Sequence, residues 1–272
     1  MQTPELASGA GDSAAGEDPA GLIRFEGVSF GYRADHQVLR GVDLELAPGT
    51  MTALVGPSGS GKSTLAKLLP RFYDVDAGRI TIGGTDIRDI PSAELYRTVG
   101  FVFQDVRLIR GTIADNLRLA RPDAGLGDLE RAARAARIHD RILALPRGYD
   151  SEIGVDVVLS GGEAQRLSIA RTLLADTPVL VLDEATAFAD PESEAAVQDA
   201  LAELVAGRTV LVIAHRLHTI TGVDRILVLD NGTLVEQGDH ASLHAAGGLY
   251  QRLWEINAAA LHSVAGAEEE TR

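Results

Sequence analysis

The sequence contains no cysteine, so disulfide bonds and thiolate chemistry are excluded, a usage that fits the cytoplasm. It also lacks long hydrophobic runs. The most apolar stretches, residues 178–182 and 209–214, have the length of a strand, whereas a transmembrane helix needs roughly 20 residues. No apolar run that could serve as a secretory signal stands near the N-terminus. From these absences we expect a chain that is soluble by itself.

Positive charge is also scarce. The chain has 25 basic against 39 acidic residues, which gives a formal net charge of −14. A surplus of negative charge repels phosphate backbones, so we expect no nucleic-acid partner. Lysine is rarer still, because Lys62 and Lys67 are the only two. In a sequence that prefers arginine so strongly, a lysine at position 62 indicates a need for a compact ammonium group.

The hydrophobic pattern indicates one large domain between two polar tails. A length of 272 residues, 45% of them hydrophobic, is sufficient for one sizeable core. Residues 1–20 and 259–272 are poor in large apolar side chains, so we expect both tails to be disordered. Between them the pattern predicts a strand-rich start, an α/β core, an inserted helical block and a return to the core. The predicted elements include strands at 42–46, 51–55, 178–183 and 225–229, largely helical regions at about 128–146 and 162–175, a helix at 191–206, and a tight Asn231-Gly232 turn.

Residues 56–64 read GPSGSGKST and match the phosphate-binding motif G-x-x-x-x-G-K-[ST] in full. Glycines let backbone N–H groups turn toward phosphate oxygens, and the helix that begins near Gly61 directs its positive end at them. We expect Lys62 to reach the β- and γ-phosphates and Ser63 to bind Mg²⁺. The predicted nucleotide-binding residues are Gly56, Pro57, Ser58, Gly59, Ser60, Gly61, Lys62, Ser63 and Thr64.

An acidic pair ends the apolar strand predicted at 178–183. In a chain with a phosphate-binding loop, Asp183 is expected to bind Mg²⁺, directly or through water. Glu184 is then placed to orient and deprotonate the attacking water. Taken alone, the same pattern also describes a core strand that is followed by a helix-capping acid.

A third motif, LSGGEAQR, spans residues 159–166 just ahead of a predicted helix. Ser160, Gly161 and Gly162 form a helix start that can bind an anion, with the serine hydroxyl as an additional donor. Taken alone, the segment equally fits an ordinary serine N-cap in a glycine-rich loop.

In this order and at these spacings, the three motifs resemble the ATP-binding-cassette family over residues 22–258. The resemblance implies an ATPase with ATP and Mg²⁺ as ligands. It also implies an α/β fold in which a RecA-like P-loop core carries an antiparallel β subdomain and an inserted α-helical subdomain at about 105–177. Residues 21–258 would form this nucleotide-binding domain.

The resemblance assigns roles to four further residues. Tyr32 resembles the aromatic residue that stacks on adenine, and His215 resembles the switch histidine that contacts the γ-phosphate. Gln104 resembles the glutamine that links Mg²⁺ and the attacking water to the transmembrane coupling region. Asp190 resembles the aspartate of the loop that crosses the dimer interface. Read alone, Tyr32 would be a core aromatic residue, Gln104 a surface glutamine and His215 a strand-end histidine.

The family geometry also implies a partner. Two cassettes pack head to tail, and each ATP lies between the P-loop of one chain and the signature segment of the other. A second nucleotide-binding domain, identical or different, would therefore receive Ser160, Gly161, Gly162 and Glu163 in trans. Glu163 replaces the usual glutamine, and as a carboxylate it can still accept a bond from the ribose hydroxyls.

Several stretches resemble the exporter-type branch, among them QDVRLIRGTIADNL from residue 104 and GDHASLHAAGGLYQRLW from residue 238. Within that branch, LLPRFYDVDAGRITIGG and DEATAFADPE resemble siderophore-linked bacterial transporters. The resemblance implies a motor domain at the cytoplasmic face of the cell membrane. Its transmembrane domain would stand on the same or a separate chain and move a siderophore or another small molecule.

Some features depart from the family pattern or leave an alternative open. Residues 187–190 read AFAD in place of SALD, and residues 152–156 stand one residue short where the exporter branch touches its membrane partner. The alternative function is a soluble ATP-binding-cassette ATPase. Such proteins carry coiled-coil or zinc-binding insertions between the P-loop and the signature, and this chain shows neither heptads nor cysteines there.

Overall fold

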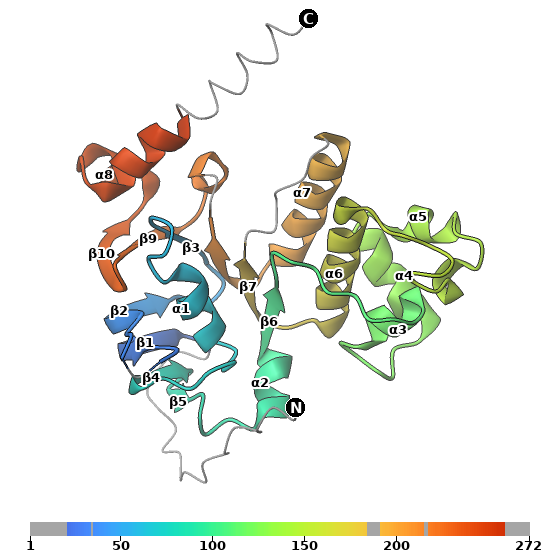
Figure 1. Cartoon of the computed structure of the whole chain (residues 1–272), viewed down its shortest axis with the longest axis horizontal. Helices are drawn as coiled ribbons and strands as arrows, with labels where there is room; N and C mark the ends of the chain where they lie inside the picture. The colour runs from blue at the N-terminus through green and yellow to red at the C-terminus, as the bar shows by residue number, and fades with distance from the viewer. Residues whose placement is uncertain (1–20, 34, 184–190, 215–216, 259–272) are drawn as a thin grey trace, which may run out of the picture. The chain divides into compact units, whose positions relative to one another are not determined.

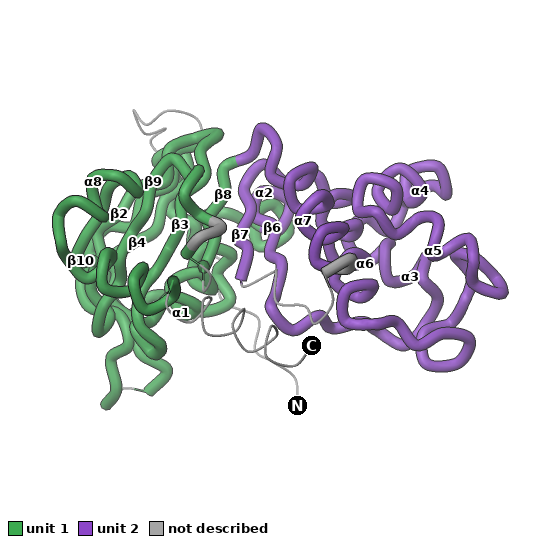
Figure 2. Tube along the Cα trace, turned by 90° about the horizontal axis from the view of Figure 1, so that it is seen from above, with its two compact units in different colours: residues 1–95, 209–272 green, residues 96–208 purple. Residues whose placement is uncertain are grey.

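The computed structural model describes residues 21–33, 35–183, 191–214 and 217–258. The chain divides into two compact units, which are coloured separately in Figure 2. The first takes residues up to 95 together with residues from 209 onward, and the second takes residues 96–208.

The first unit contains an antiparallel sheet with the strand order β2-β1-β4-β5. The strands are β1 (Ile23–Phe30), β2 (Leu39–Leu46), β4 (Ala77–Ile82) and β5 (Thr85–Asp86), and Figure 1 shows the first three side by side. In β2 the apolar residues Val42, Leu44 and Leu46 are buried, and they alternate with the exposed residues Asp43 and Glu45. The predicted half-buried antiparallel strand at 42–46 is therefore confirmed.

A parallel arrangement of strands surrounds β3 (Met51–Val55) in the same unit. β3 pairs in parallel with β8 (Thr209–Ile213) on one side and with β9 (Arg225–Asp230) on the other. β9 then turns back into β10 (Thr233–Gly238). Asn231 and Gly232 adopt φ values of 47° and 79°, as a type I′ turn requires, so the predicted hairpin turn is confirmed. Glycine is also required at position 232 for a steric reason, because a Cβ there would lie 2.0 Å from the carbonyl oxygen of Val38.

The first unit also contains several helices, which follow these strands along the chain. α1 (Lys62–Leu68) follows the loop after β3, and η2 (Leu217–Ile220) follows the segment after β8. α8 (His240–Ala245) and a last helical segment at 249–258 complete the unit. β3, β9, η2, α8 and the last helical segment share a buried cluster of Ala53, Val55, Ala214, Leu217, Ile220, Ile226, Val228, Leu243 and Tyr250.

The second unit is built around one long helix. α6 (Gly161–Ala175) contacts α3 (Ile113–Arg118), α4 (Leu126–Ala135), α7 (Pro191–Val205) and the strand β6 (Val99–Val102). β6 pairs in parallel with β7 (Val179–Asp183). α5 (His139–Leu143) and η1 (Gly148–Asp150) lie between α4 and α6 along the chain, and α2 (Ser92–Thr98) leads into β6. Figure 1 shows α3 and α4 gathered around α6.

A buried polar link holds α3 to α6. The Nε atom of Arg171 on α6 donates to the carbonyl oxygen of Asn116 at 2.9 Å, and its Nη2 atom donates to Asn116 Oδ1 at 3.3 Å. Asn116 is fully buried and also bonds to the backbone of Ile109 in both directions. Burial lowers the pKa of Arg171 from its ordinary value. The link ties the irregular segment before α3 to the helix that begins at the signature motif.

The predicted fold class, α/β with an antiparallel β subdomain and an inserted helical block, is confirmed. The largely helical region predicted at about 128–146 is confirmed, and it consists of two helices, α4 and α5. α4 ends before Arg137, which adopts a φ of 53° that a right-handed helix does not allow. In the part of the chain that the structure describes, no helix has the length and apolar character needed to cross a membrane.

The last helical segment offers a test of how the first unit is held together. The carboxylate of Glu236 on β10 accepts hydrogen bonds from the backbone N–H groups of Leu249 at 2.5 Å and Tyr250 at 3.0 Å. Glu236→Ala removes this cap, so we expect the free energy of unfolding to fall by about 1 kcal/mol. Urea denaturation followed by circular dichroism measures the loss. Val235→Ala, at an exposed neighbouring position, is the control and should change stability by less than about 0.5 kcal/mol.

Candidate functional site

The loop at 56–61 has the backbone that phosphate binding requires. Gly56, Gly59 and Gly61 adopt φ values of 151°, 78° and 104°, which place them in regions open mainly to glycine. Gly56 also packs against the end of β9, where an added Cβ would lie 2.0 Å from the carbonyl oxygen of Leu229. The loop is therefore turned by its glycines and held against the β9 strand behind it.

Two polar side chains of the loop face inward. Lys62 is buried, and its Nζ atom donates to the carbonyl oxygens of Gly56 and Pro57, both at 2.9 Å. The hydroxyl of Ser60 is buried and has no hydrogen-bond partner among the described residues. A buried hydroxyl without a partner costs about 1–3 kcal/mol, and a phosphate oxygen would supply the missing acceptor. The loop thus fits the predicted phosphate site, with Ser58 and Gly59 exposed at its crest.

Tyr32 lies beside this loop rather than in the core. Its ring is 50% exposed, and its hydroxyl is 3.2 Å from the hydroxyl of Thr64, the predicted nucleotide-binding residue that follows Ser63. A hollow of about 490 Å³ is lined by Tyr32, Arg33, Asp35 and His36. The core position that Tyr32 would have if read alone is excluded. The exposed ring next to the loop is suited to stacking on a base.

The second unit brings together two of the residues predicted to bind metal. β6 and β7 run parallel with Val102 opposite Leu182. Gln104 follows β6 and is exposed, and Asp183 ends β7 and is buried. Both residues therefore lie at the carboxyl ends of neighbouring strands. Carboxylate and amide oxygens are donors of the type that Mg²⁺ prefers.

The signature segment forms a complete helix cap. Ser160 is the N-cap of α6, and its hydroxyl oxygen accepts from the backbone N–H of Glu163 at 3.2 Å. The carboxylate of Glu163 accepts in turn from the N–H of Ser160 at 2.8 Å. Ser160 and Gly161 are exposed. Because the serine oxygen is an acceptor in this capping box, the hydroxyl hydrogen remains available for a ligand.

Glu163 has a second partner that the sequence did not reveal. Its Oε1 atom accepts from Nε of Arg141 on α5 at 2.5 Å, and the glutamate side chain is only 16% exposed. Burial alone would raise the pKa of Glu163, but the Ser160 N–H and the Arg141 guanidinium outweigh it and hold the pKa below its ordinary value. Both carboxylate oxygens are engaged within the chain. Arg141 offsets the charge that Glu163 adds to the signature.

The short segment at 152–156 is also held by an arginine, Arg147. Nε of Arg147 donates to Asp156 at 2.9 Å, and its Nη2 atom donates to Glu152 at 3.2 Å. The Glu152 N–H donates to the same Asp156 carboxylate at 2.7 Å. This backbone bond and the Arg147 ion pair hold the pKa of Asp156 below its ordinary value. Val155 and Val158 remain exposed on this compact turn.

Three predicted residues, Glu184, Asp190 and His215, lie outside the described residues, and so do both predicted tails. Their roles stay predictions.

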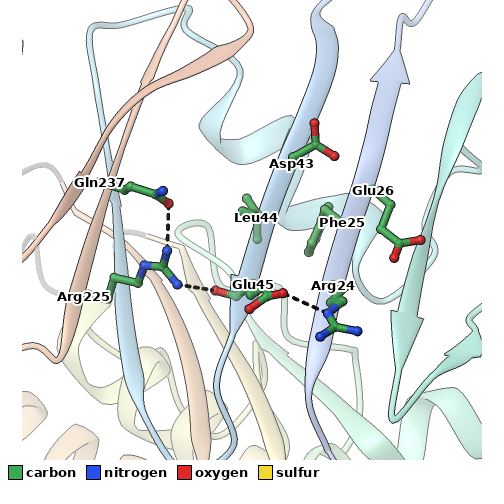
Figure 3. A pocket seen from close by; sticks show the side chains of 8 residues that line it. All are labelled: Arg24, Phe25, Glu26, Asp43, Leu44, Glu45, Arg225 and Gln237. Carbon is green, nitrogen blue, oxygen red and sulfur yellow. Dashed lines mark hydrogen bonds and ion pairs between the residues drawn. The ribbon is translucent and has the colours of Figure 1, made fainter. Parts of the chain in front are cut away.

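A second hollow of about 450 Å³ lies in the first unit, away from the loop residues (Figure 3). Its two arginines bond to other residues of the lining: Arg24 to Glu45 at 2.9 Å and Arg225 to Gln237 at 2.8 Å. Arg225 also reaches the carbonyl oxygen of Glu45. These bonds join β2 to β9 and β10, so the polar residues of this hollow serve to connect strands.

Comparison with known proteins identifies the family of this chain. Residues 39–187 match the family model described as ABC transporter, more than half of the chain. The chain belongs to the ABC transporter family. The predicted resemblance to this family is therefore confirmed.

Three individual ABC transporter proteins illustrate what this chain is similar to within the family. The chain is 59% identical over 257 residues to the mycobactin import ATP-binding/permease protein IrtA of Mycobacterium tuberculosis, covering 94% of the chain and 30% of that protein. It is 46% identical over 237 residues to human ATP-binding cassette sub-family B member 6, covering 87% of the chain and 28% of that protein. The solved structure of a bacterial Atm1-family ABC exporter with ATP bound matches with a TM-score of 0.82 and 44% identity, over 89% of the chain and 43% of the exporter. The chain spans less than a third of the curated relatives it matches.

The ion pair between Arg141 and Glu163 makes a pH prediction. Because the folded pKa of Glu163 is depressed, its ionised form contributes stability that is present above the ordinary value of 4.5 and is lost as the pH falls through the folded value. Arg141 is 39% exposed. Arg141→Gln should therefore lower the free energy of unfolding at pH 7 by only about 0.5 kcal/mol. The decline in stability as the pH falls below 4.5 should become shallower.

Urea unfolding at several pH values tests this, with Arg131→Gln as the control. Arg131 is an exposed arginine on α4 that pairs with Asp128 and does not contact the signature. An acid-range pH dependence that is unchanged by Arg141→Gln would contradict the assignment of the depressed pKa to this ion pair.

Proposed function

We propose that this chain is the motor domain of an exporter-type transporter and that it hydrolyses ATP in a head-to-tail dimer. The observation that supports the proposal best is the presence, in one chain, of a formed phosphate loop and an exposed signature cap. The loop holds an inward-facing ammonium and an unpartnered buried hydroxyl. The cap presents the hydroxyl of Ser160 at a helix start. Each is half of a phosphate site, and a partner chain would supply the other half.

In cis, the loop binds the triphosphate. The ammonium of Lys62 exchanges its bonds to the loop carbonyls of Gly56 and Pro57 for bonds to the β- and γ-phosphates. The hydroxyl of Ser60 gains the acceptor that it lacks, and Tyr32 stacks on adenine. The sequence motifs assign Mg²⁺ to Ser63, Asp183 and Gln104, whose oxygen atoms would hold the ion. When it is bound, the ion neutralises charge on the phosphates and helps to align them.

In trans, the signature cap completes the electrostatic environment of the γ-phosphate. The hydroxyl of Ser160 and the first N–H groups of α6, from Gly161 and Gly162, approach the phosphate of the partner chain. Donors that are already held in place cost no reorganisation at the moment of reaction. Glu163 lies in the same turn, and Arg141 keeps its carboxylate occupied so that it does not repel the phosphates.

Glu184 is the base that deprotonates the attacking water, His215 contacts the γ-phosphate, and Asp190 serves communication across the dimer interface. These assignments rest on the sequence motifs, since the three residues lie outside the described part of the chain.

The cargo follows from the relatives. A protein that is 59% identical over 94% of this chain is named a mycobactin import ATP-binding/permease protein. We infer a transmembrane partner domain, on the same or a separate chain, and a siderophore or a related small molecule as cargo. The motor would lie at the cytoplasmic face of the membrane. These relatives disfavour a soluble ATPase.

The catalytic base has a direct test. Glu184→Gln keeps the shape of the side chain and removes its basicity, so ATP binding should persist while turnover falls by about 100- to 10,000-fold. Calorimetry measures binding, and phosphate release measures turnover. Size-exclusion chromatography with ATP should show the variant accumulating as a dimer. Turnover at the wild-type rate would remove Glu184 from this role.

Mixing two inactive variants tests the head-to-tail dimer. Lys62→Ala damages the cis half of a site, and Ser160→Ala damages the trans half. A mixed dimer would contain one site with both defects and one intact site. Mixtures in equal amounts should therefore regain activity, up to about one quarter of wild type for random pairing. If chains exchange and no activity returns, each site is built from one chain and the dimer model is wrong.

The transporter role is tested by isolating the chain from native membranes in mild detergent. Recovery with a polytopic membrane protein, as a fusion or a complex, is expected. Recovery from the soluble fraction without such a protein would contradict the role.

A further inference from the structure

The segment that follows α1 carries an aromatic ring against Tyr32. Tyr73 contacts Tyr32 with ring centroids 5.2 Å apart and an interplanar angle of 88°, an edge-to-face arrangement. Phe30 makes the same kind of contact with Tyr32 at 5.1 Å and 84°. Phe30 and Tyr73 also touch each other at 5.5 Å. The three rings therefore form a closed aromatic triad.

The three members of the triad differ in exposure. Phe30 is buried in the antiparallel sheet, whereas Tyr32 and Tyr73 are 50% and 42% exposed. Two exposed tyrosines are not needed to fill a core. Their edge-to-face contact does, however, restrict the orientation of each ring, and such a contact is favourable beyond the area that it buries.

The backbone beneath Tyr73 is also fixed, which makes it a suitable support. Arg71 is buried and adopts a φ of 57°, and its guanidinium pairs with Asp74 at 2.6 Å. Asp76 then closes the segment onto β1, because its carboxylate accepts from the Gly31 N–H at 2.8 Å and its own N–H donates to Ser29 at 2.9 Å. The residues on both sides of Tyr73 are thus anchored, one side directly to the residue before Tyr32.

We propose that Tyr73 is a positioning residue of the nucleotide site, which holds the ring of Tyr32 in the orientation that stacks on the base. This inference rests on the proposed role of Tyr32. Tyr32 is then fixed from three directions: by Phe30, by Tyr73 and by the hydroxyl of Thr64 at 3.2 Å. A ring that is oriented before ATP arrives loses less conformational freedom on binding.

The inference separates base binding from phosphate binding. Tyr73 acts on the base through Tyr32, whereas the phosphates are held by the loop at 56–64. Its loss should therefore weaken ligands that carry a base and spare ligands that are phosphate alone. A residue with a merely structural role would weaken both, because the loop and Tyr32 belong to the same unit.

The experiment is a calorimetric titration of the full chain with ATP and with inorganic tripolyphosphate, both in the presence of Mg²⁺. For Tyr73→Ala we expect ATP binding about three- to tenfold weaker, the cost of ordering one side chain on binding, while tripolyphosphate binding stays within about twofold. Tyr73→Phe keeps the ring and should restore ATP affinity. Tyr96→Ala, at an exposed tyrosine on α2, is the matched control and should leave both affinities unchanged.

Parallel titrations of Tyr32→Ala distinguish the two levels of the argument. If Tyr32→Ala weakens ATP binding and Tyr73→Ala does not, the base site stands and the positioning role of Tyr73 is wrong. If Tyr73→Ala weakens ATP and tripolyphosphate equally, the positioning role is also wrong. If Tyr32→Ala leaves ATP affinity unchanged, base stacking fails and the inference fails with it. Circular dichroism and thermal midpoints of each variant establish that it is folded.

Discussion

The phosphate loop imposes the constraint on which the first unit depends. Backbone N–H groups can bind an anion only if they turn away from regular hydrogen bonding and are held there. Gly56, Gly59 and Gly61 provide the turn, and Gly56 lies against the carbonyl of Leu229 so closely that no other residue fits. The Gly232 N–H of the β9–β10 hairpin donates to the carbonyl of Ser60 at 3.0 Å. The far hairpin thus serves as a support for the loop, which explains why the chain returns to this strand group after the second unit.

The signature segment meets a different constraint, since its donors must remain accessible. Ser160 and Glu163 satisfy each other within the first turn of α6, so the cap is ordered without covering the helix start. An additional carboxylate at that place would repel a triphosphate. Arg141 removes most of this penalty by pairing with it at 2.5 Å. Behind the cap, Arg171 and Asn116 fix the other end of the same helix through buried bonds. A rigid helix with a neutralised cap is a suitable element to present donors to another chain.

Local sequence signals predicted the parts of the molecule that are locally determined. The loop motif, the alternation of β2, the buried strand β7 and the Asn231-Gly232 turn each depend on residues close in the chain, and the structure confirms them. The contacts that the sequence did not reveal join distant residues. No local sequence pattern links Arg141 to Glu163. The same holds for Tyr32 and Tyr73, between which α1 lies along the chain. The sequence predicted a largely helical region here but not the place of the break between α4 and α5, because the left-handed conformation of Arg137 is not indicated by its residue type.

The net charge of −14 makes the local arrangement of cations decisive. ATP is itself an anion, so the long-range field of the protein opposes its approach rather than steering it. At physiological ionic strength this field is screened beyond about 8 Å, whereas contacts within the loop are not. Binding must therefore come from groups within reach of the phosphates, among which the buried Lys62 is prominent. It must also come from terms that do not depend on charge, of which the proposed stacking on Tyr32 is one. This division explains why an acidic domain keeps an ordered aromatic ring beside its phosphate loop: the base contributes affinity that the surrounding electrostatics does not oppose.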